Sequence, residues 1–138
     1  MASHQDELTA LRAIEAVLER YLRALHESDA DTLGVIFHPC ACLHSVPEGA
    51  VQVQTRDAWI EKVRHRPSPL SQGHPRDDRV IAIQVMGGDM ASATVHARLP
   101  PRDLVDQLLL LHTEAGWRIV AKCFRTDVPA PRDGQHEA

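Results

Sequence analysis

The chain lacks an excess of basic residues, because its 15 Lys and Arg stand against 19 Asp and Glu, and its formal net charge is −4. A nucleic-acid-binding surface needs a clustered excess of Lys and Arg, which neutralise the phosphates. No such cluster is visible in the sequence. We therefore expect no nucleic-acid partner.

Long apolar runs and a secretion signal are missing as well. No apolar stretch approaches the roughly 20 residues that a membrane-spanning helix needs. The first residues, MASHQDELT, lack the basic and then apolar pattern of a signal peptide. These absences predict a cytoplasmic protein without a membrane partner.

Cysteine is scarce, with Cys40, Cys42 and Cys123 as the complete set. Their number is odd, and a disulfide between Cys40 and Cys42 would close a strained, very small ring, so we expect reduced thiols. His38 and His44 alternate with the first two cysteines, which suggests a metal site. In an extended strand, however, the outer two ligands would lie roughly 20 Å apart, whereas the ligands of one zinc lie within about 4 Å of each other. We expect neither a metal nor a cofactor.

What is present fits one soluble domain. An apolar content of 43% and a charged content of 25% over 138 residues suffice for a real hydrophobic core. The polar composition after Pro129 is typical of a disordered tail. We predict a flexible N-terminus at 1–6, one domain at 7–127 and a flexible C-terminal tail at 128–138.

Apolar residues recur at three- and four-residue spacing in the first part of the chain, which predicts an amphipathic helix over 7–26. Tyr21 lies on its apolar side. A short second helix is predicted over 32–37, ending before Pro39. Thr55 can cap a third helix over 56–65, with Trp59 and Val63 on its buried side.

The rest of the chain has strand character. Two short strands, 41–46 and 50–54, flank a Pro-Glu-Gly turn, and four longer strands follow at 79–86, 90–99, 103–113 and 117–126. Helices followed by antiparallel strands predict an α+β fold in which the helices pack on one face of a single curved sheet.

Three segments resemble the nuclear transport factor 2-like superfamily, and within it the lumazine-binding-like and SnoaL-like groups. They are RYLRALHESDADTLGVIF, TRDAWIEKVR and DQLLLLHTEAGWRIVAKCF, and the resemblance covers about residues 8–127. It implies a cone of helices and bent sheet whose interior holds a small-molecule pocket, with two subunits paired through the outer sheet face. Residues 108–111 are apolar on both strand faces, which also favours a homodimer.

One acid, Asp106, interrupts the apolar run LVDQLLLL at 104–111. A buried carboxylate costs several kcal/mol unless it is paired, so this acid is exposed, paired, or held neutral for a purpose. The ketosteroid isomerases resemble this chain in the spacing of Arg20, Tyr21, Ala24, Leu25, Asp29, Asp31 and Phe37. By that resemblance Tyr21 and a protonated Asp106 would face one pocket and polarise a carbonyl together. An ion pair with Arg98 or Lys122 would instead keep Asp106 ionised.

The resemblance fails at the catalytic base, because Ser45 stands where the isomerases have an aspartate and a serine hydroxyl is too weak a base. Strand alternation puts Thr94, His96 and Arg98 on one face, and by the same resemblance that face looks into the pocket. His96 or His44 could then move a proton. An Arg and Asp arrangement also resembles limonene epoxide hydrolases, which keeps hydrolysis or hydration open.

Two functions remain open. The first is an isomerase, cyclase or hydratase with Tyr21, Asp106 and His96 as catalytic residues. The second is a non-catalytic module that binds a small ligand or dimerises. In either case we predict a substrate-binding pocket lined by Phe37, His38, His44, Ser45, Trp59, Val63, Thr94, Arg98, Leu108 and Cys123.

Overall fold

The computed structural model describes residues 4–127. Residues 1–3 and the tail predicted at 128–138 lie outside the described residues. The first helix begins at His4, three residues before its predicted start and within the N-terminus that was expected to be flexible. The elements in chain order are α1 (His4–Glu27), α2 (Ala30–Ile36), β1 (Phe37–Ser45), β2 (Gln52–Thr55), α3 (Arg56–His65), β3 (Asp78–Met86), β4 (Met90–Leu99), β5 (Arg102–Thr113) and β6 (Gly116–Asp127).

The helix boundaries follow from local chemistry. α1 ends where Ser28 adopts a left-handed conformation, with φ of 53°. The side chain of Asp29 then accepts a hydrogen bond from the Thr32 amide at 3.1 Å and caps α2. Thr55 caps α3 in the same way, accepting from the Ala58 amide at 3.2 Å, as its position before the helix predicted.

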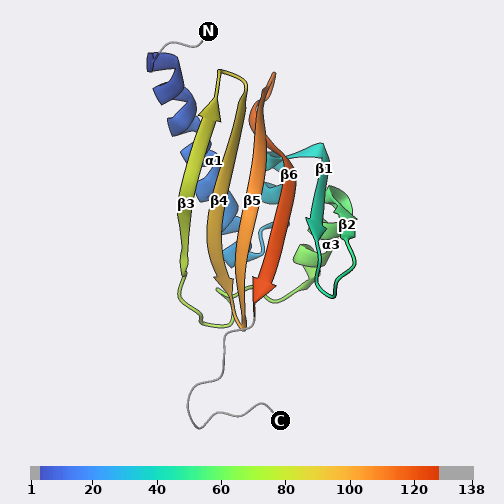
Figure 1. The fold of residues 1–138 in the computed structure, drawn as a ribbon. Helices are drawn as coiled ribbons and strands as arrows, with labels where there is room; N and C mark the ends of the chain where they lie inside the picture. The colour runs from blue at the N-terminus through green and yellow to red at the C-terminus, as the bar shows by residue number, and fades with distance from the viewer. Residues whose placement is uncertain (1–3, 128–138) are drawn as a thin grey trace.

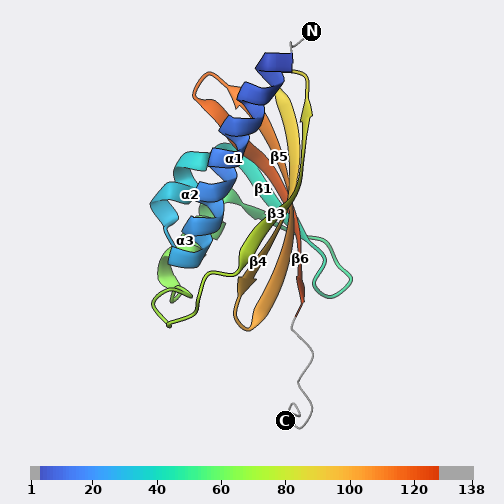
Figure 2. The same cartoon turned by 90° about the vertical axis from the view of Figure 1, so that its left-hand side faces the viewer.

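Six strands form one sheet in the order β2-β1-β6-β5-β4-β3. β1 runs parallel to β6, and the other neighbouring pairs are antiparallel (Figure 1). Seen from the side, the three helices lie together against one face of this curved sheet (Figure 2). The predicted α+β fold, with helices on one face of a bent sheet, is confirmed.

A β-bulge changes which side chains of β6 face the helices. Leu109 pairs with Ala121 and Leu110 with Ile119, so Val120 is an extra residue on β6. An extra residue reverses the alternation of side chains beyond it. The buried positions of β6 are therefore Trp117 and Ile119 before the bulge and Lys122 after it.

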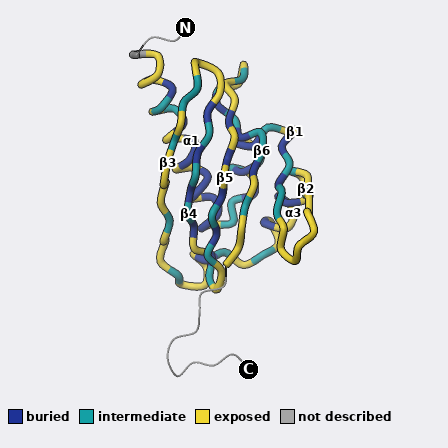
Figure 3. The backbone as a smooth tube through the Cα atoms, in the orientation of Figure 1, coloured by how far each residue is buried: buried dark blue, intermediate teal, exposed yellow. Residues whose placement is uncertain are grey.

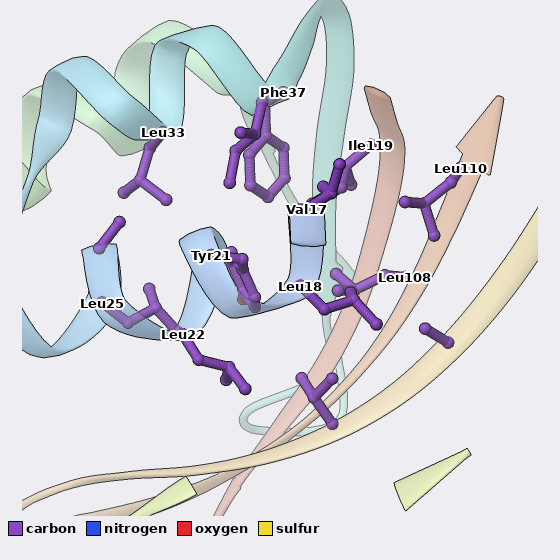
Figure 4. Packing of buried hydrophobic residues seen from close by; sticks show 14 of the residues in the cluster. Val17, Leu18, Tyr21, Leu22, Leu25, Leu33, Phe37, Leu108, Leu110 and Ile119 are labelled. Carbon is purple, nitrogen blue, oxygen red and sulfur yellow. The ribbon is translucent and has the colours of Figure 1, made fainter. Parts of the chain in front are cut away.

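The core lies between the helices and the inner face of the sheet, where buried segments of the two layers meet (Figure 3). α1 supplies Ile14, Leu18 and Tyr21, each 0% exposed, and β5 supplies Leu108 and Leu110, also 0% exposed. In a closer view, Tyr21 lies among labelled aliphatic side chains that include Leu18 and Leu108 (Figure 4). Its phenol ring thus enters the core from the helical side.

Candidate functional site

The acid of the leucine-rich strand points inward and meets the phenol of the first helix. β5 alternates so that Leu104, Asp106 and Leu108 face the helices. The Tyr21 hydroxyl donates a hydrogen bond of 2.5 Å to Asp106 Oδ2, and both residues are 0% exposed. The structure thus brings these two side chains together on the helix side of the sheet, where both are buried in the core. Burial, followed by the neighbouring Asp106 carboxylate, raises the pKa of Tyr21 well above its ordinary value of 10.0.

Lys122 completes a buried cluster with this pair. Its Nζ lies 3.6 Å from Asp106 Oδ2, and the side chain is 4% exposed. The sequence left Arg98 and Lys122 open as partners of Asp106. The structure pairs Asp106 with Lys122, whereas Arg98 lies 3.9 Å from Asp103. We call Tyr21, Asp106 and Lys122 the buried triad.

Aromatic rings surround the Lys122 ammonium. Its Nζ lies 4.6 Å from the centroid of the Trp59 ring, 5.0 Å from that of Phe124 and 5.3 Å from that of Tyr21. Such contacts favour the cation. Burial acts in the opposite direction and lowers the pKa of Lys122, while Asp106 raises it and Arg66 lowers it further. The ammonium is therefore held by ring faces and one carboxylate oxygen in a place that water hardly reaches.

One oxygen of the triad has no partner among residues 4–127. Asp106 Oδ1 is buried and makes no hydrogen bond, whereas Oδ2 faces both the Tyr21 hydroxyl and the Lys122 ammonium. A buried polar atom without a hydrogen bond costs about 1–3 kcal/mol. The triad thus lowers the stability of the fold. Buried ionisable groups of this kind are concentrated at functional sites.

A cavity of about 200 Å³ includes Lys122 in its wall. It lies where α3, β2 and the ends of β4, β5 and β6 come together. We call it the lysine pocket. Its lining residues are Leu25, Gln54, Trp59, Lys62, Arg66, Leu99, Arg102, Leu104, Lys122, Phe124 and Thr126. Tyr21 and Asp106 are not part of its wall, so Lys122 is the member of the triad that a molecule in this pocket would touch.

Three larger hollows lie elsewhere on the molecule. One, of about 560 Å³, lies between the first half of α1 and the turn from β5 to β6, where Trp117 is part of its wall. A second, of about 720 Å³, lies between the loop after β1 and the end of β6. A third, of about 310 Å³, lies between α2 and α3. None of the three is lined by a member of the buried triad. Because the buried charges adjoin the lysine pocket alone among these four, we take that pocket as the candidate site.

The predicted polar face of β4 points away from the interior. Val95 lies directly opposite Asp106 and is 0% exposed, so the inner face of β4 carries the small apolar side chains. Thr94, His96 and Arg98 lie on the outer face, where His96 Nε2 is 3.8 Å from Asp103 Oδ1. The prediction that these three residues face the pocket is wrong, because the helices cover the apolar set of this strand.

The remaining predicted pocket residues are scattered over four places. Trp59 is the one that lines the lysine pocket. Phe37, Val63 and Leu108 lie in the hydrophobic core and are at most 1% exposed. His38 accepts a hydrogen bond at its own Nδ1 from the Cys40 amide at 3.1 Å. The 720 Å³ hollow contains His44, Ser45 and Cys123.

Cys123 was predicted to line the pocket, a position that simple alternation from Ile119 along β6 would give it. The bulge at Val120 turns it outward, where it is exposed, and puts Lys122 in its place. Sequence reasoning also missed the arginines of the lysine pocket, Arg66 and Arg102. Arg66 follows α3 and Arg102 begins β5, so no periodic pattern marks either as part of a site.

A comparison with protein-family models identifies the relatives of this chain. Residues 9–125 match the model of the family described as putative lumazine-binding. The chain belongs to this family. No curated protein matches the chain significantly. Within residues 4–127, no helix combines the length and the apolar character needed to cross a membrane.

Solved structures share the fold. A nuclear transport factor 2-like protein of unknown function from Silicibacter pomeroyi is 25% identical, with a TM-score of 0.75, and the match covers 91% of this chain and 100% of that one. A similar protein of unknown function from Shewanella baltica is 19% identical with a TM-score of 0.79, covering 94% and 100%. One from Methylobacillus flagellatus is 22% identical with a TM-score of 0.72, covering 92% and 96%. These matches confirm the nuclear transport factor 2-like fold that the sequence motifs indicated.

Proposed function

We propose that this chain binds a small organic molecule in the lysine pocket. The observation that carries the proposal is a cavity whose wall includes a buried lysine, Lys122, which is paired with Asp106. Trp59 and Phe124 provide ring faces in the same wall, and ligand sites combine such apolar walls with a few fixed polar groups. The family description points to a lumazine, a heterocycle, as one ligand to test.

The size of the cavity limits the ligand. Pockets for drug-sized molecules measure about 300–1,000 Å³, whereas the lysine pocket measures about 200 Å³. A ligand that fits is therefore small, and only one group of it can reach Lys122. The ammonium donates hydrogen bonds and accepts none, so that group must offer a lone pair, such as a carbonyl oxygen or a ring nitrogen.

Filling the pocket tests the proposal. Gln54→Trp places a large ring in the wall, whereas Val53→Trp, at the neighbouring position of β2, adds the same ring outside the pocket, where Val53 is 58% exposed. Lumazine and a panel of small heterocycles are titrated into the wild type and both variants by calorimetry. We expect the wild type and Val53→Trp to bind alike and Gln54→Trp to bind at least about tenfold more weakly, a loss of about 1.4 kcal/mol. Unchanged affinity in Gln54→Trp would rule out this pocket.

A catalytic form of the proposal uses the same residues. The chain would then be an isomerase, cyclase or hydratase in which Lys122 moves a proton to or from the bound molecule. Tyr21 and Asp106, proposed from the sequence as polarising groups, lie behind Lys122 and would hold it in place. The lowered pKa of Lys122 favours this role, because a general base works best when its pKa lies near the working pH.

Exchange of carbon-bound hydrogen in the ligand measures this chemistry. In heavy water, nuclear magnetic resonance would detect loss of ligand C–H signals in the presence of wild-type protein. Lys122→Met, which keeps the length of the side chain and removes the amine, should abolish the exchange. Binding without any exchange in the wild type would leave the non-catalytic alternative.

We also propose a homodimer that pairs through the outer face of the sheet. Leu109 and Leu111 on β5 support it, since they are 46% and 41% exposed on the side away from the helices. Exposed apolar residues at neighbouring outward positions favour burial against another surface. Light scattering measures the mass of the assembly in solution.

A further inference from the structure

The wall of the lysine pocket has more cationic than anionic side chains, although the chain as a whole has more acidic than basic residues. Four cationic side chains line it, Lys62, Arg66, Arg102 and Lys122, and its wall contains no aspartate or glutamate. The whole chain has a formal net charge of −4. The excess of cations is therefore a property of this cavity and not of the composition.

Six other arginines of residues 4–127 have carboxylate partners, whereas Arg12, Arg20, Arg79 and Arg118 have none. Arg64 lies 3.2 Å from Asp31, and Arg76 lies 2.7 Å from Glu19. Within the described residues, the guanidinium groups of Arg66 and Arg102 make no hydrogen bond or ion pair. These two groups thus hold donors that no neighbouring side chain uses.

Arg66 is partly buried, so a guanidinium group without a partner at this position reduces the stability of the fold. The side chain is partly buried between α3 and the sheet. Burial, followed by the repulsion of Arg102, lowers the pKa of Arg66 from its ordinary value. Lys62 differs, because its Nζ donates to Gln54 Oε1 at 3.0 Å and is exposed. An anion between the two guanidinium groups would compensate the charge and use their donors.

Most of the rest of the wall is apolar, since Leu25, Trp59, Leu99, Leu104 and Phe124 line it beside the polar Gln54 and Thr126. A molecule that satisfies both parts has an apolar body and one anionic end. We propose that the ligand of the lysine pocket is a small carboxylic acid whose carboxylate is bound by Arg66 and Arg102. This inference rests on the proposed function and specifies the chemical class of the ligand.

Two probes of the same shape distinguish the effect of ligand charge on affinity from the effect of ligand shape. Benzoate and benzamide both carry a flat ring, and they differ in that one head group is an anion and the other is neutral. Each is titrated by calorimetry, at low ionic strength, into the full-length wild type and into Arg66→Gln, Arg102→Gln and Arg66→Lys. Arg64→Gln is the matched control, because it removes the same charge near the same end of α3 but from a side chain outside the pocket.

We expect the wild type to bind benzoate more tightly than benzamide. Hydrogen bonds to a charged group correspond to roughly a tenfold to hundredfold difference in the dissociation constant. Arg66→Gln and Arg102→Gln should each reduce this preference by about tenfold or more, and Arg66→Lys should retain part of it because the charge remains. Arg64→Gln should keep the full preference. Circular dichroism of each variant confirms that it is folded.

Three results would overturn the inference. The first is equal affinity of the wild type for benzoate and benzamide, which leaves the proposed pocket intact and removes its preference for acids. The second is an equal loss of preference in Arg64→Gln and Arg66→Gln, which would indicate a general effect of net charge. The third is no benzoate binding at all, in which case titration of the neutral heterocycles decides separately whether the lysine pocket binds any ligand.

Discussion

Removal of the Lys122 charge should destabilise the fold more than an ordinary lysine substitution. Asp106 is 0% exposed, and its Oδ1 already lacks a partner within the described residues. In Lys122→Met the carboxylate would keep the Tyr21 hydroxyl as its hydrogen-bond donor and lose the cation 3.6 Å away. Breaking a buried ion pair from one side costs about 3–5 kcal/mol, because a charge stays buried without compensation. We expect a loss of that size.

Removal of all three polar groups should restore the stability. Tyr21→Phe, Asp106→Leu and Lys122→Met together leave an apolar cluster of similar volume. Replacing a buried ion pair by well-packed apolar residues is often neutral or stabilising by about 1–4 kcal/mol. The triple variant should therefore be at least as stable as the wild type, although it has three substitutions in the core.

Urea unfolding followed by circular dichroism measures both effects, with the slope of the transition compared to verify that the unfolded states are alike. Domains of this size are typically stable by about 5–15 kcal/mol, so a loss of 3–5 kcal/mol is readily seen. Lys62→Met is the control, because Lys62 lies in the same pocket with an exposed ammonium, and it should cost less than about 1 kcal/mol. A cost below about 1 kcal/mol for Lys122→Met, or a triple variant no more stable than that single one, would refute the reasoning.

Two further predictions concern the tyrosine and the outer sheet face. Tyr21 is the single tyrosine of the chain, so ultraviolet absorbance follows its ionisation directly. Because its pKa is raised above the unfolded value of 10.0, the stabilising contribution of the protonated phenol is complete below that pH and is lost as the pH rises beyond it. The folded protein should show no tyrosinate until the pH lies well above 10.0, and a normal titration would contradict the burial of this phenol. In the proposed homodimer, Leu109→Glu would occur twice in a symmetric interface, and at about 1.5–3 kcal/mol for each buried leucine it should weaken association more than about 100-fold. Light scattering that finds the same mass for both proteins over a dilution series would exclude this face as the interface.

The order of the helices and strands was predictable from the sequence alone, although α2 covers Ala30–Ile36 instead of 32–37 and β1 begins at Phe37 instead of 41. Helix α3 and strand β4 have the bounds that periodicity and turn residues predicted, because those signals are local. Asp106 was identified from the sequence because it interrupts an apolar run, and Tyr21 from the resemblance to the ketosteroid isomerases. A buried polar group needs a hydrogen-bond partner, and Tyr21 and Asp106 form this hydrogen bond with each other.

Tertiary structure decided the remaining features. Alternation along β4 defines two faces, but which one the helices cover depends on packing, and this put His96 outside. One extra residue, Val120, placed Lys122 inside in place of Cys123, because a side-chain period of two reverses with every insertion. Arg66 and Arg102 are 36 positions apart and share one cavity because the fold brings the end of α3 beside the start of β5. The sequence therefore determined which residues are buried within each element, whereas the contacts between distant elements determined which charges meet.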